Sequence, residues 1–467
     1  MEKQKKKFVM PHTYVILIAV IILMAICTYI IPAGEYARVE DPNTGRMVVD
    51  PDSFASVDAN PTKPFDLVKS IPQGMDAACS IVFFIFIVGG SFNIIMSTGA
   101  IERGIGKVAI ASRGKEKLLI PLVVFIFSIG GATFGMSEEA IAFIPIGVAL
   151  ARAVGYDAMV GCAIVSLGAA VGFNSAWMNP FTVGVAQGIA ELPTFSGIEL
   201  RLVIWAVSLV VTSLYIMRYA SKIKKNPELS IVADIELQEK DNKIDLDNLG
   251  KMSAKDSLVL LAFVIGMLIL VYGVFTYGWY FTEICALFIT MGVVCGLIAG
   301  RGPSTMAGDF IAGAKDIVFG ALVVGIARAV LVVMENGLII DSVVHGLASV
   351  VSLLPKSIAA IGMMIVQVLI NFFIPSGSGQ AAVTMPIMAP LADILGMTRQ
   401  TAVLAFQFGD GFTNSIIPTA ATLMANLSIA KISYDRWVKF VAPLIGIWVV
   451  MGMAFMVIAT VINYGPF

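Results

Sequence analysis

Four short polar clusters interrupt long apolar stretches of the chain, and they form two pairs of similar composition. One pair is 135–139 (GMSEE) and 375–380 (PSGSGQ), and the other is 172–175 (GFNS) and 409–415 (GDGFTNS). Gly, Pro and Ser at this density break helices and free backbone N–H and C=O groups. Helix N-termini attract carboxylates, whereas freed carbonyl oxygens attract cations. The clusters therefore have the chemistry to bind a small charged solute or an ion.

The candidate binding residues in and just after these clusters carry a polar side chain or are glycines that let the backbone approach a ligand. They are Ser137, Glu138, Glu139, Asn174, Ser175, Asn179, Ser376, Gly377, Ser378, Gly379, Gln380, Asp410, Thr413, Asn414, Ser415 and Thr419. For a single cluster we would favour close helix packing as the explanation, because small residues also permit it. Four clusters at matching positions favour binding.

Charged residues inside apolar segments are costly and usually functional. We expect Asp410, and at least one of Glu138 and Glu139, to bind a substrate or a cation. Arg328 lies well inside a predicted span, where it either holds a substrate carboxylate or neutralises a nearby acid. Glu283 lies near a span end, and we expect it to be solvated or at the membrane interface.

The composition identifies the class of protein in which these clusters lie. Only 13% of the 467 residues are charged and 58% are hydrophobic, whereas soluble domains carry about 25% charged residues. This excludes a soluble enzyme, a disordered chain and a secreted disulfide scaffold, and it predicts an all-α polytopic membrane protein. The net charge of −1 provides no basic field for nucleic acid. The five cysteines are scattered in apolar runs, so we expect neither a disulfide framework nor a metal centre.

Apolar runs of about 20 residues predict membrane-spanning helices. The first, 14–31, follows a lysine cluster and is long for a cleaved signal peptide. Further full-length candidates are 79–98, 202–219, 258–275, 279–299, 317–334 and 438–462. The stretches 117–155 and 356–396 have apolar arms around a polar centre, which predicts two re-entrant hairpins. The stretches 158–190 and 399–430 are too long for one clean span and predict two broken helices.

The distribution of basic residues predicts the orientation, because positive charge collects on the cytoplasmic side. It places the N-terminus in the cytoplasm, the acidic loop 32–78 outside, and 221–256 inside as a linker between two halves. The basic loops agree with this scheme only if the two hairpins do not cross. The prediction is about nine crossings in the cytoplasmic (inner) membrane, with an external C-terminus.

The two halves of the chain resemble each other, which predicts a repeat formed by 1–220 and 257–467. Asn174 and Ser175 recur as Asn414 and Ser415, 240 positions later, and similar matches at offsets of 238 and 241 flank them. The spans 79–98 and 317–334 run in opposite directions in the predicted topology, so the repeat is expected to be inverted. Inverted repeats with interrupted helices are typical of secondary transporters, whose substrate site lies near the midplane.

The polar motifs also resemble a known family. The run 375–386 (PSGSGQAAVTMP), followed by 406–414 (FQFGDGFTN), is similar to the YfcC-like branch of the C4-dicarboxylate anaerobic carrier (DcuC) family. The segments 135–140 and 31–36 (IPAGEY) show the same resemblance, which covers nearly the whole chain. The wider ion transporter superfamily implies a homodimer and elevator-type alternating access. It also implies that each protomer has a scaffold and a mobile part, with two hairpins and two broken helices in the mobile part.

The substrate class is left open by this resemblance. The family name suggests dicarboxylates, whereas some YfcC-like relatives are associated with arginine–ornithine exchange. Glu138, Glu139 and Asp410 outnumber Arg328 in the predicted core, so a dianion would meet net repulsion there. We therefore expect transport of a small amino acid, basic ones first. The alternative is a C4-dicarboxylate or another organic carboxylate coupled to Na⁺ or H⁺, with Na⁺ at the hairpin tips and helix breaks; no other cofactor is expected.

An intramembrane aspartyl protease and an ion channel are the two alternatives to a transporter. The pairs Tyr156-Asp157 and Gly409-Asp410 superficially match the two-aspartate pattern of an intramembrane aspartyl protease. Gln407, however, stands where that pattern needs Gly, and Asp157 falls near a membrane edge. An ion channel would need a continuous pore, which capped hairpins oppose. We therefore expect a transporter and not an enzyme.

Overall fold

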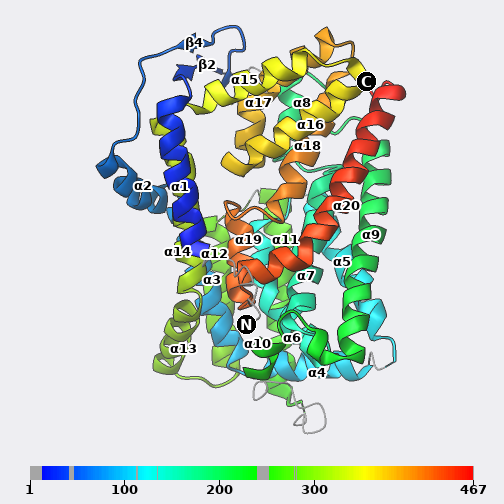
Figure 1. Cartoon of the computed structure of the whole chain (residues 1–467). Coiled ribbons are helices and arrows are strands. Elements are labelled where there is room, and N and C mark those ends of the chain that lie inside the picture. Colours follow the sequence, from blue (N-terminus) through cyan, green and yellow to red (C-terminus); the bar gives the residue numbers. More distant parts are fainter. Residues whose placement is uncertain are drawn as a thin grey trace, which may run out of the picture.

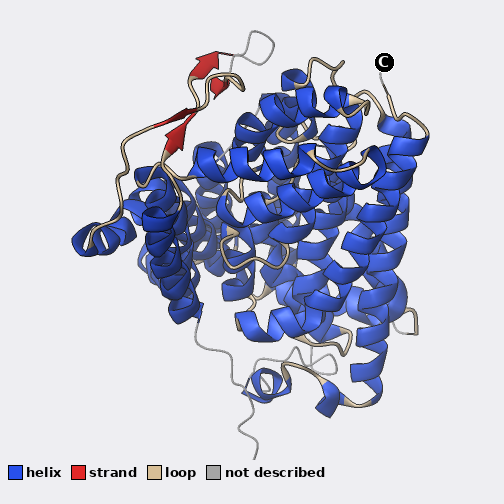
Figure 2. Cartoon of the chain, turned by 45° about the horizontal axis from the view of Figure 1, so that its top comes forward, coloured by secondary structure: helices blue, strands red, loops and turns tan. Residues whose placement is uncertain are grey.

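The computed structural model describes residues 13–40, 47–111, 114–133, 135–238, 252–277, 279 and 281–465. These residues are mostly helical (Figure 1). The exceptions are two small antiparallel sheets that lie beyond the helices (Figure 2). Strand β1 (Gly34–Glu35) pairs with β4 (Ala55–Ser56), and β2 (Arg38–Glu40) pairs with β3 (Met47–Val49).

The helices confirm a multi-pass membrane protein. Within the described residues, six helices are long and apolar enough to cross a bilayer, or seven if one bent pair is counted as a single span. Large apolar side chains on two of these helices and on two other apolar helices are exposed, among them Leu214, Val450, Leu23 and Leu268. Such a surface requires a lipid environment.

The same series of helices occurs twice along the chain. The first series is α2 (Pro64–Ala77), α3 (Cys79–Met96), α4 (Ala100–Ala111), α5 (Glu116–Thr133), α6 (Ile144–Ala153), α7 (Ala158–Ser175), α8 (Val183–Ile189) and α9 (Ile198–Lys225). The second series is α13 (Pro303–Asp316), α14 (Val318–Asn336), α15 (Ile340–Ser352), α16 (Lys356–Phe373), α17 (Gly377–Ile394), α18 (Arg399–Asn414), α19 (Ala421–Ile429) and α20 (Tyr434–Val461). Helices α4 and α6 lie at one end of the molecule, whereas α15 and α17 lie at the other (Figure 1).

The helices pack into two groups. In the first, which we call the α14 group, α14 contacts α1, α2 and α3, while α3 also contacts α12 and α13. It includes α1 (Thr13–Ile30), α11 (Ala254–Tyr277) and α12 (Phe281–Ile298). In the second, the α18 group, α7 packs on α5, α6 and α9, α18 packs on α16, α17 and α20, and α7 contacts α18. Helix α19 follows α18 in the chain and contacts α7 and α20, so we count it in the α18 group. It also contacts α14 of the first group.

Four features differ from the sequence-based boundaries. Helix α2 occupies the end of the loop expected over 32–78, and α13 precedes the span expected over 317–334. Both helices mix polar with apolar residues, so their windows lack the uniform apolar run that marks a span. The expected boundary at 220 falls inside α9, which ends at Lys225. The expected linker contains a short helix, η2 (Pro227–Leu229), and α10 (Ala233–Gln238); the rest of it up to 251 lies outside the described residues.

Candidate functional site

The cluster 135–139, which we call the first tip, follows α5 and includes the start of the short helix η1 (Glu138–Phe143). Gly135 has φ +71°, a left-handed conformation that favours glycine, and an added Cβ would lie 2.7 Å from Asn179 Oδ1. The Ser137 N–H donates to a Glu139 carboxylate oxygen at 3.2 Å, and the Ser137 hydroxyl lies 3.4 Å from that of Thr422 on α19. The glutamates therefore lie on a tight turn that packs against both broken helices.

The cluster 375–380, which we call the second tip, joins α16 to the first turn of α17. Ser376 is the N-cap of α17, and its hydroxyl accepts from the Gly379 N–H at 3.4 Å. A Cβ added to Gly377 would lie 2.4 Å from Thr182 Cγ2 and 3.1 Å from Asp410 Oδ2. The N-terminus of α17, which carries partial positive charge, thus lies against the buried carboxylate of Asp410.

Helix α18 ends inside the molecule, and a polar network holds its last turn. Asp410 is fully buried. Its Oδ1 accepts from Asn414 Nδ2 at 3.1 Å, while its Oδ2 has no hydrogen-bond partner. The Asn371 side chain donates to the Asp410 carbonyl, Thr413 Oγ1 and Asn414 Oδ1 at 2.8–3.0 Å. This network leaves one buried carboxylate oxygen of Asp410 without a hydrogen-bond donor.

Helix α7 ends at Ser175, where Ala176 takes a left-handed conformation with φ 43°. Gln407 on α18 donates to the freed Phe173 carbonyl at 2.7 Å. The Asn174 side chain is buried and neither of its polar atoms is hydrogen-bonded. A Cβ added to Gly411 would lie 2.6 Å from Asn174 Oδ1. The two helix breaks therefore lie in direct contact.

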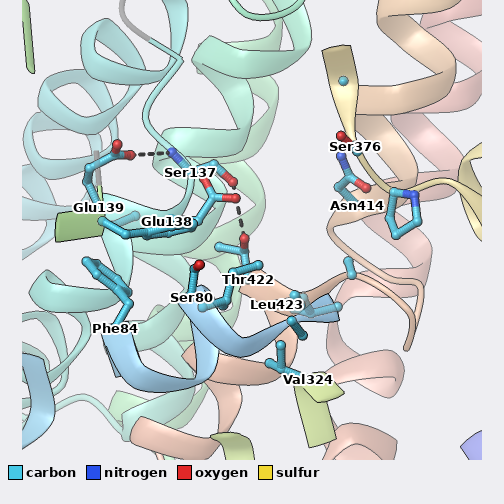
Figure 3. Close-up of a pocket in the computed structure, with 18 of the residues that line it drawn as sticks. Ser80, Phe84, Ser137, Glu138, Glu139, Val324, Ser376, Asn414, Thr422 and Leu423 are labelled. Atoms are coloured by element: carbon cyan, nitrogen blue, oxygen red, sulfur yellow. Dashed lines mark hydrogen bonds between the residues drawn. The ribbon is translucent and has the colours of Figure 1, made fainter. Parts of the chain in front are cut away.

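A cavity of about 1060 Å³ lies between the two tips and the two helix groups. Ten of the predicted binding residues line it: Ser137, Glu138, Glu139, Arg328, Ser376, Gly377, Ser378, Asn414, Ser415 and Thr419. In Figure 3, Ser137 and Glu138 face Thr422, and Ser376 and Asn414 lie on the other side of the cavity. The α14 group contributes lining from α3, α12 and α14. The polar clusters, which lie far apart in the sequence, thus meet at one space.

Seven predicted residues do not line this cavity. They are Asn174, Ser175, Asn179, Gly379, Gln380, Asp410 and Thr413. Gly379 lines a second cavity of about 340 Å³, which also touches Arg328 and Ser376. Gln380 donates to the backbone and side chain of Gln367 on α16, so it joins the two arms of the second hairpin. The remaining residues support the tips and breaks from behind.

Several cavity residues were not predicted as binding residues. Glu283, in the first turn of α12, was expected to be solvated or interfacial and not to bind the solute; it lines the cavity. Ser80, Ser166, Thr422 and Asn426 line it as well. Glu283 stands near the end of an apolar run, where sequence alone does not distinguish a lipid interface from a cavity wall. The lining thus holds three glutamates and Arg328.

Asp157 does not pair with Asp410. Its carboxylate caps the first turn of α7, at the opposite end of that helix from Ser175, and accepts from Tyr219 and Ser230. Within the described residues, no group of three or more His, Cys, Asp or Glu side chains is placed to hold a metal ion. The arrangement is a cavity with polar and charged lining residues between packed helices.

A multi-pass helical protein in which two interrupted helices lie beside a polar cavity is typical of a membrane transporter. The chain matches the C4-dicarboxylate anaerobic carrier (DcuC) family over residues 10–461, and it belongs to that family. The family and its members are transporters, so the chain is not an enzyme and the aspartyl protease interpretation is wrong.

Two relatives align with almost the whole chain. An Escherichia coli (strain K12) protein named "Putative basic amino acid antiporter YfcC" is 36% identical over 499 residues, covering 99% of this chain and 98% of the relative. A Haemophilus influenzae protein without a functional name is 30% identical, covering 98% of each chain. Among solved structures, the Alcanivorax borkumensis YdaH transporter has a TM-score of 0.42 at 12% identity, covering 98% of this chain and 100% of that one. Neisseria gonorrhoeae MtrF has a TM-score of 0.42 at 17% identity, covering 97% and 95%.

Proposed function

We propose that the protein is a secondary antiporter that exchanges basic amino acids by an elevator movement. The charge of the cavity is the observation that carries this proposal. Glu138 and Glu139 line the cavity from the first tip, Glu283 lines it from α12, and Arg328 is the basic residue among its described lining. Asp410 adds a buried carboxylate behind the second tip.

This charge balance favours a cation over a dianion. At an effective dielectric of about 20, two unit charges about 4 Å apart interact with about 4 kcal/mol. A basic amino acid presents two cationic groups to the acids and one carboxylate to Arg328 or to the N-terminus of α17. A C4-dicarboxylate would bring two negative charges to the same walls. The name of the E. coli relative supports basic amino acid antiport.

The division of the cavity wall supports an elevator movement. Both tips and both broken helices belong to the α18 group, whereas α3, α12 and α14 form the opposite wall. A solute held by the first set could be carried along the second while the second stays in place. The equivalent helices at opposite ends of the molecule support an inverted repeat (Figure 1). The homodimer, the cytoplasmic N-terminus and coupling to Na⁺ or H⁺ stay predictions.

A thermal-shift screen tests the substrate class. Arginine, ornithine, succinate and fumarate would each be added to the purified protein in detergent, with sodium chloride as an ionic-strength control. Only a ligand that prefers the folded state raises the unfolding midpoint. We expect arginine and ornithine to raise it. A shift with succinate and none with arginine would contradict the proposal and favour a dicarboxylate carrier.

A further inference from the structure

A buried arginine lies behind the first helix break. Arg201, the fourth residue of α9, is 0% exposed, and among the described residues it is the only buried basic side chain. Its Nη1 donates to the Ser175 carbonyl at 3.4 Å, while its Nε and Nη2 have no hydrogen-bond partner. The other polar group beside it is the phenol of Tyr464. In the described part of the chain no carboxylate forms an ion pair with this guanidinium.

The second half of the chain places a neutral residue at the same position. Trp437 is the fourth residue of α20, and its Nε1 donates to the Ser415 carbonyl at 2.8 Å. Ser175 and Ser415 are equivalent residues at the ends of the two broken helices. One neutral N–H therefore satisfies this carbonyl in the second half. The positive charge of Arg201 is not needed for the hydrogen bond.

The charge of Arg201 has an electrostatic consequence for the cavity. A charge buried without a partner is costly, and its field is only weakly screened. The partial negative charge of the α7 carboxyl end lies beside Arg201, and the carboxylates of Glu138, Glu139 and Asp410 lie on other elements of the same helix group. Arg328 lies across the cavity on α14. Arg201 thus gives the α18 group, which holds both tips, its own buried positive charge.

We propose that Arg201 is a positioning residue that sets substrate specificity: its charge creates a positive potential at the first helix break that favours a solute bearing a carboxylate. It acts through the end of α7 and does not line the cavity. The cationic groups of the solute face the glutamates, and the field of Arg201 adds to those of Arg328 and the N-terminus of α17 at its carboxylate. This inference rests on the proposed function, because it assumes that an amino acid binds in the cavity.

The test compares arginine with argininamide, in which a neutral carboxamide replaces the carboxylate. Dissociation constants for both would be measured by isothermal titration calorimetry on wild-type protein, Arg201→Gln, Arg201→Trp and Arg201→Lys. Arg201→Trp introduces the residue found at the equivalent position and keeps an N–H donor, whereas Arg201→Lys keeps the charge. Trp437→Gln is the matched control, since it exchanges one neutral donor for another.

We expect both neutral variants to bind arginine about tenfold more weakly, because a unit charge at an effective dielectric of about 20 still has an appreciable potential roughly 10 Å away. Binding of argininamide should not weaken in the neutral variants. The Arg201→Lys variant, which keeps the charge, should bind arginine about as tightly as the wild type. Trp437→Gln should leave the ratio of the two dissociation constants unchanged. Unfolding midpoints would show whether each variant is folded; if Arg201→Gln is not, Arg201→Trp alone makes the comparison.

Three results would overturn the inference. An equal loss of arginine and argininamide binding would show a structural role for Arg201. Wild-type affinity in Arg201→Trp would show that the hydrogen bond suffices without the charge. Failure of Arg201→Lys to restore binding would exclude a simple charge effect. If the wild-type protein itself binds no arginine, the proposed function fails, and the inference fails with it.

Discussion

At the scale of single residues, Asp410 combines complete burial with an unused ligand atom. Its Oδ1 is held by Asn414, and its Oδ2 faces the glycine that begins α17. A buried carboxylate without a cationic partner is unfavourable, so a bound cation or the cationic group of a solute would stabilise it. Asp410 therefore is expected to contribute to binding although it lies behind the cavity wall.

We predict that Asp410→Asn abolishes or strongly impairs arginine binding, because it removes this charge while conserving the shape of the side chain. The loss should be at least about tenfold in affinity, since breaking a buried charge interaction typically costs more than 1.4 kcal/mol. Calorimetry measures it. Asp66→Asn is the control, since Asp66 is an exposed carboxylate on α2 paired with Lys69. Equal affinities in the two variants would remove Asp410 from the site.

The paired glutamates of the first tip give a second prediction. Replacing Glu138 and Glu139 together by Gln should weaken binding of arginine by about tenfold or more, since each charge contributes about 1.7 kcal/mol at roughly 10 Å and an effective dielectric of about 20. Citrulline, which keeps the α-ammonium group but has a neutral side chain, should lose less affinity than arginine. Competition binding measures both ligands. A parallel loss for citrulline would indicate damage to the tip and not a lost charge.

At the scale of elements, the broken helices depend on close packing between α5 and α7. A Cβ added to Gly172 would lie 1.8 Å from the Ser128 carbonyl oxygen, and one added to Gly131 would lie 2.1 Å from that of Ala169. These glycines let the two backbones touch. The first tip follows the C-terminal end of α5, so the contact between α5 and α7 fixes the position of the tip relative to the break in α7.

Gly172→Ala is therefore expected to destabilise the protein by about 1–3 kcal/mol, the usual cost of overpacking. The midpoint of unfolding in detergent should fall. Gly446→Ala on α20 is the matched control, since an added Cβ there meets nothing within 4 Å. If both variants unfold at the wild-type temperature, the α5–α7 contact is not the constraint that the geometry indicates.

Some of these elements could be predicted from the sequence, and others could not. The chain turns at 135–139 and 375–380 were predictable because small and polar residues interrupt apolar runs there. Helices α2 and α13 were missed because their polar residues hide them from a hydropathy window. Arg201 lies one position before the predicted span 202–219, where a charge looks interfacial. Its burial results from tertiary contacts with α7 and Tyr464, which no local pattern encodes.

At the scale of the whole molecule, an elevator mechanism requires movement of the α18 group against the α14 group. Val324 on α14 and Leu423 on α19 both line the cavity, one from each group (Figure 3). Joining cysteines at these two positions with a short cleavable reagent that carries two thiol-reactive groups, in a variant without the five native cysteines, should abolish exchange. Cleaving the reagent should restore it.

The control for this cross-link is a pair within one group. A Cβ at Gly452 would lie 3.1 Å from the sulfur of Met364, and both residues belong to the α18 group. Cysteines joined there should leave most exchange intact. Full exchange with the Val324–Leu423 pair joined would show that the two groups need not move apart, and would contradict the elevator mechanism.

The central claim is that the cavity carries basic amino acids across the membrane in exchange for one another. The most direct measurement is uptake of labelled arginine by liposomes that contain the purified protein. We predict saturable uptake into liposomes loaded with ornithine, and little uptake into empty ones. Succinate outside should not compete. Uptake of labelled succinate with none of arginine, or current without saturation, would contradict the claim.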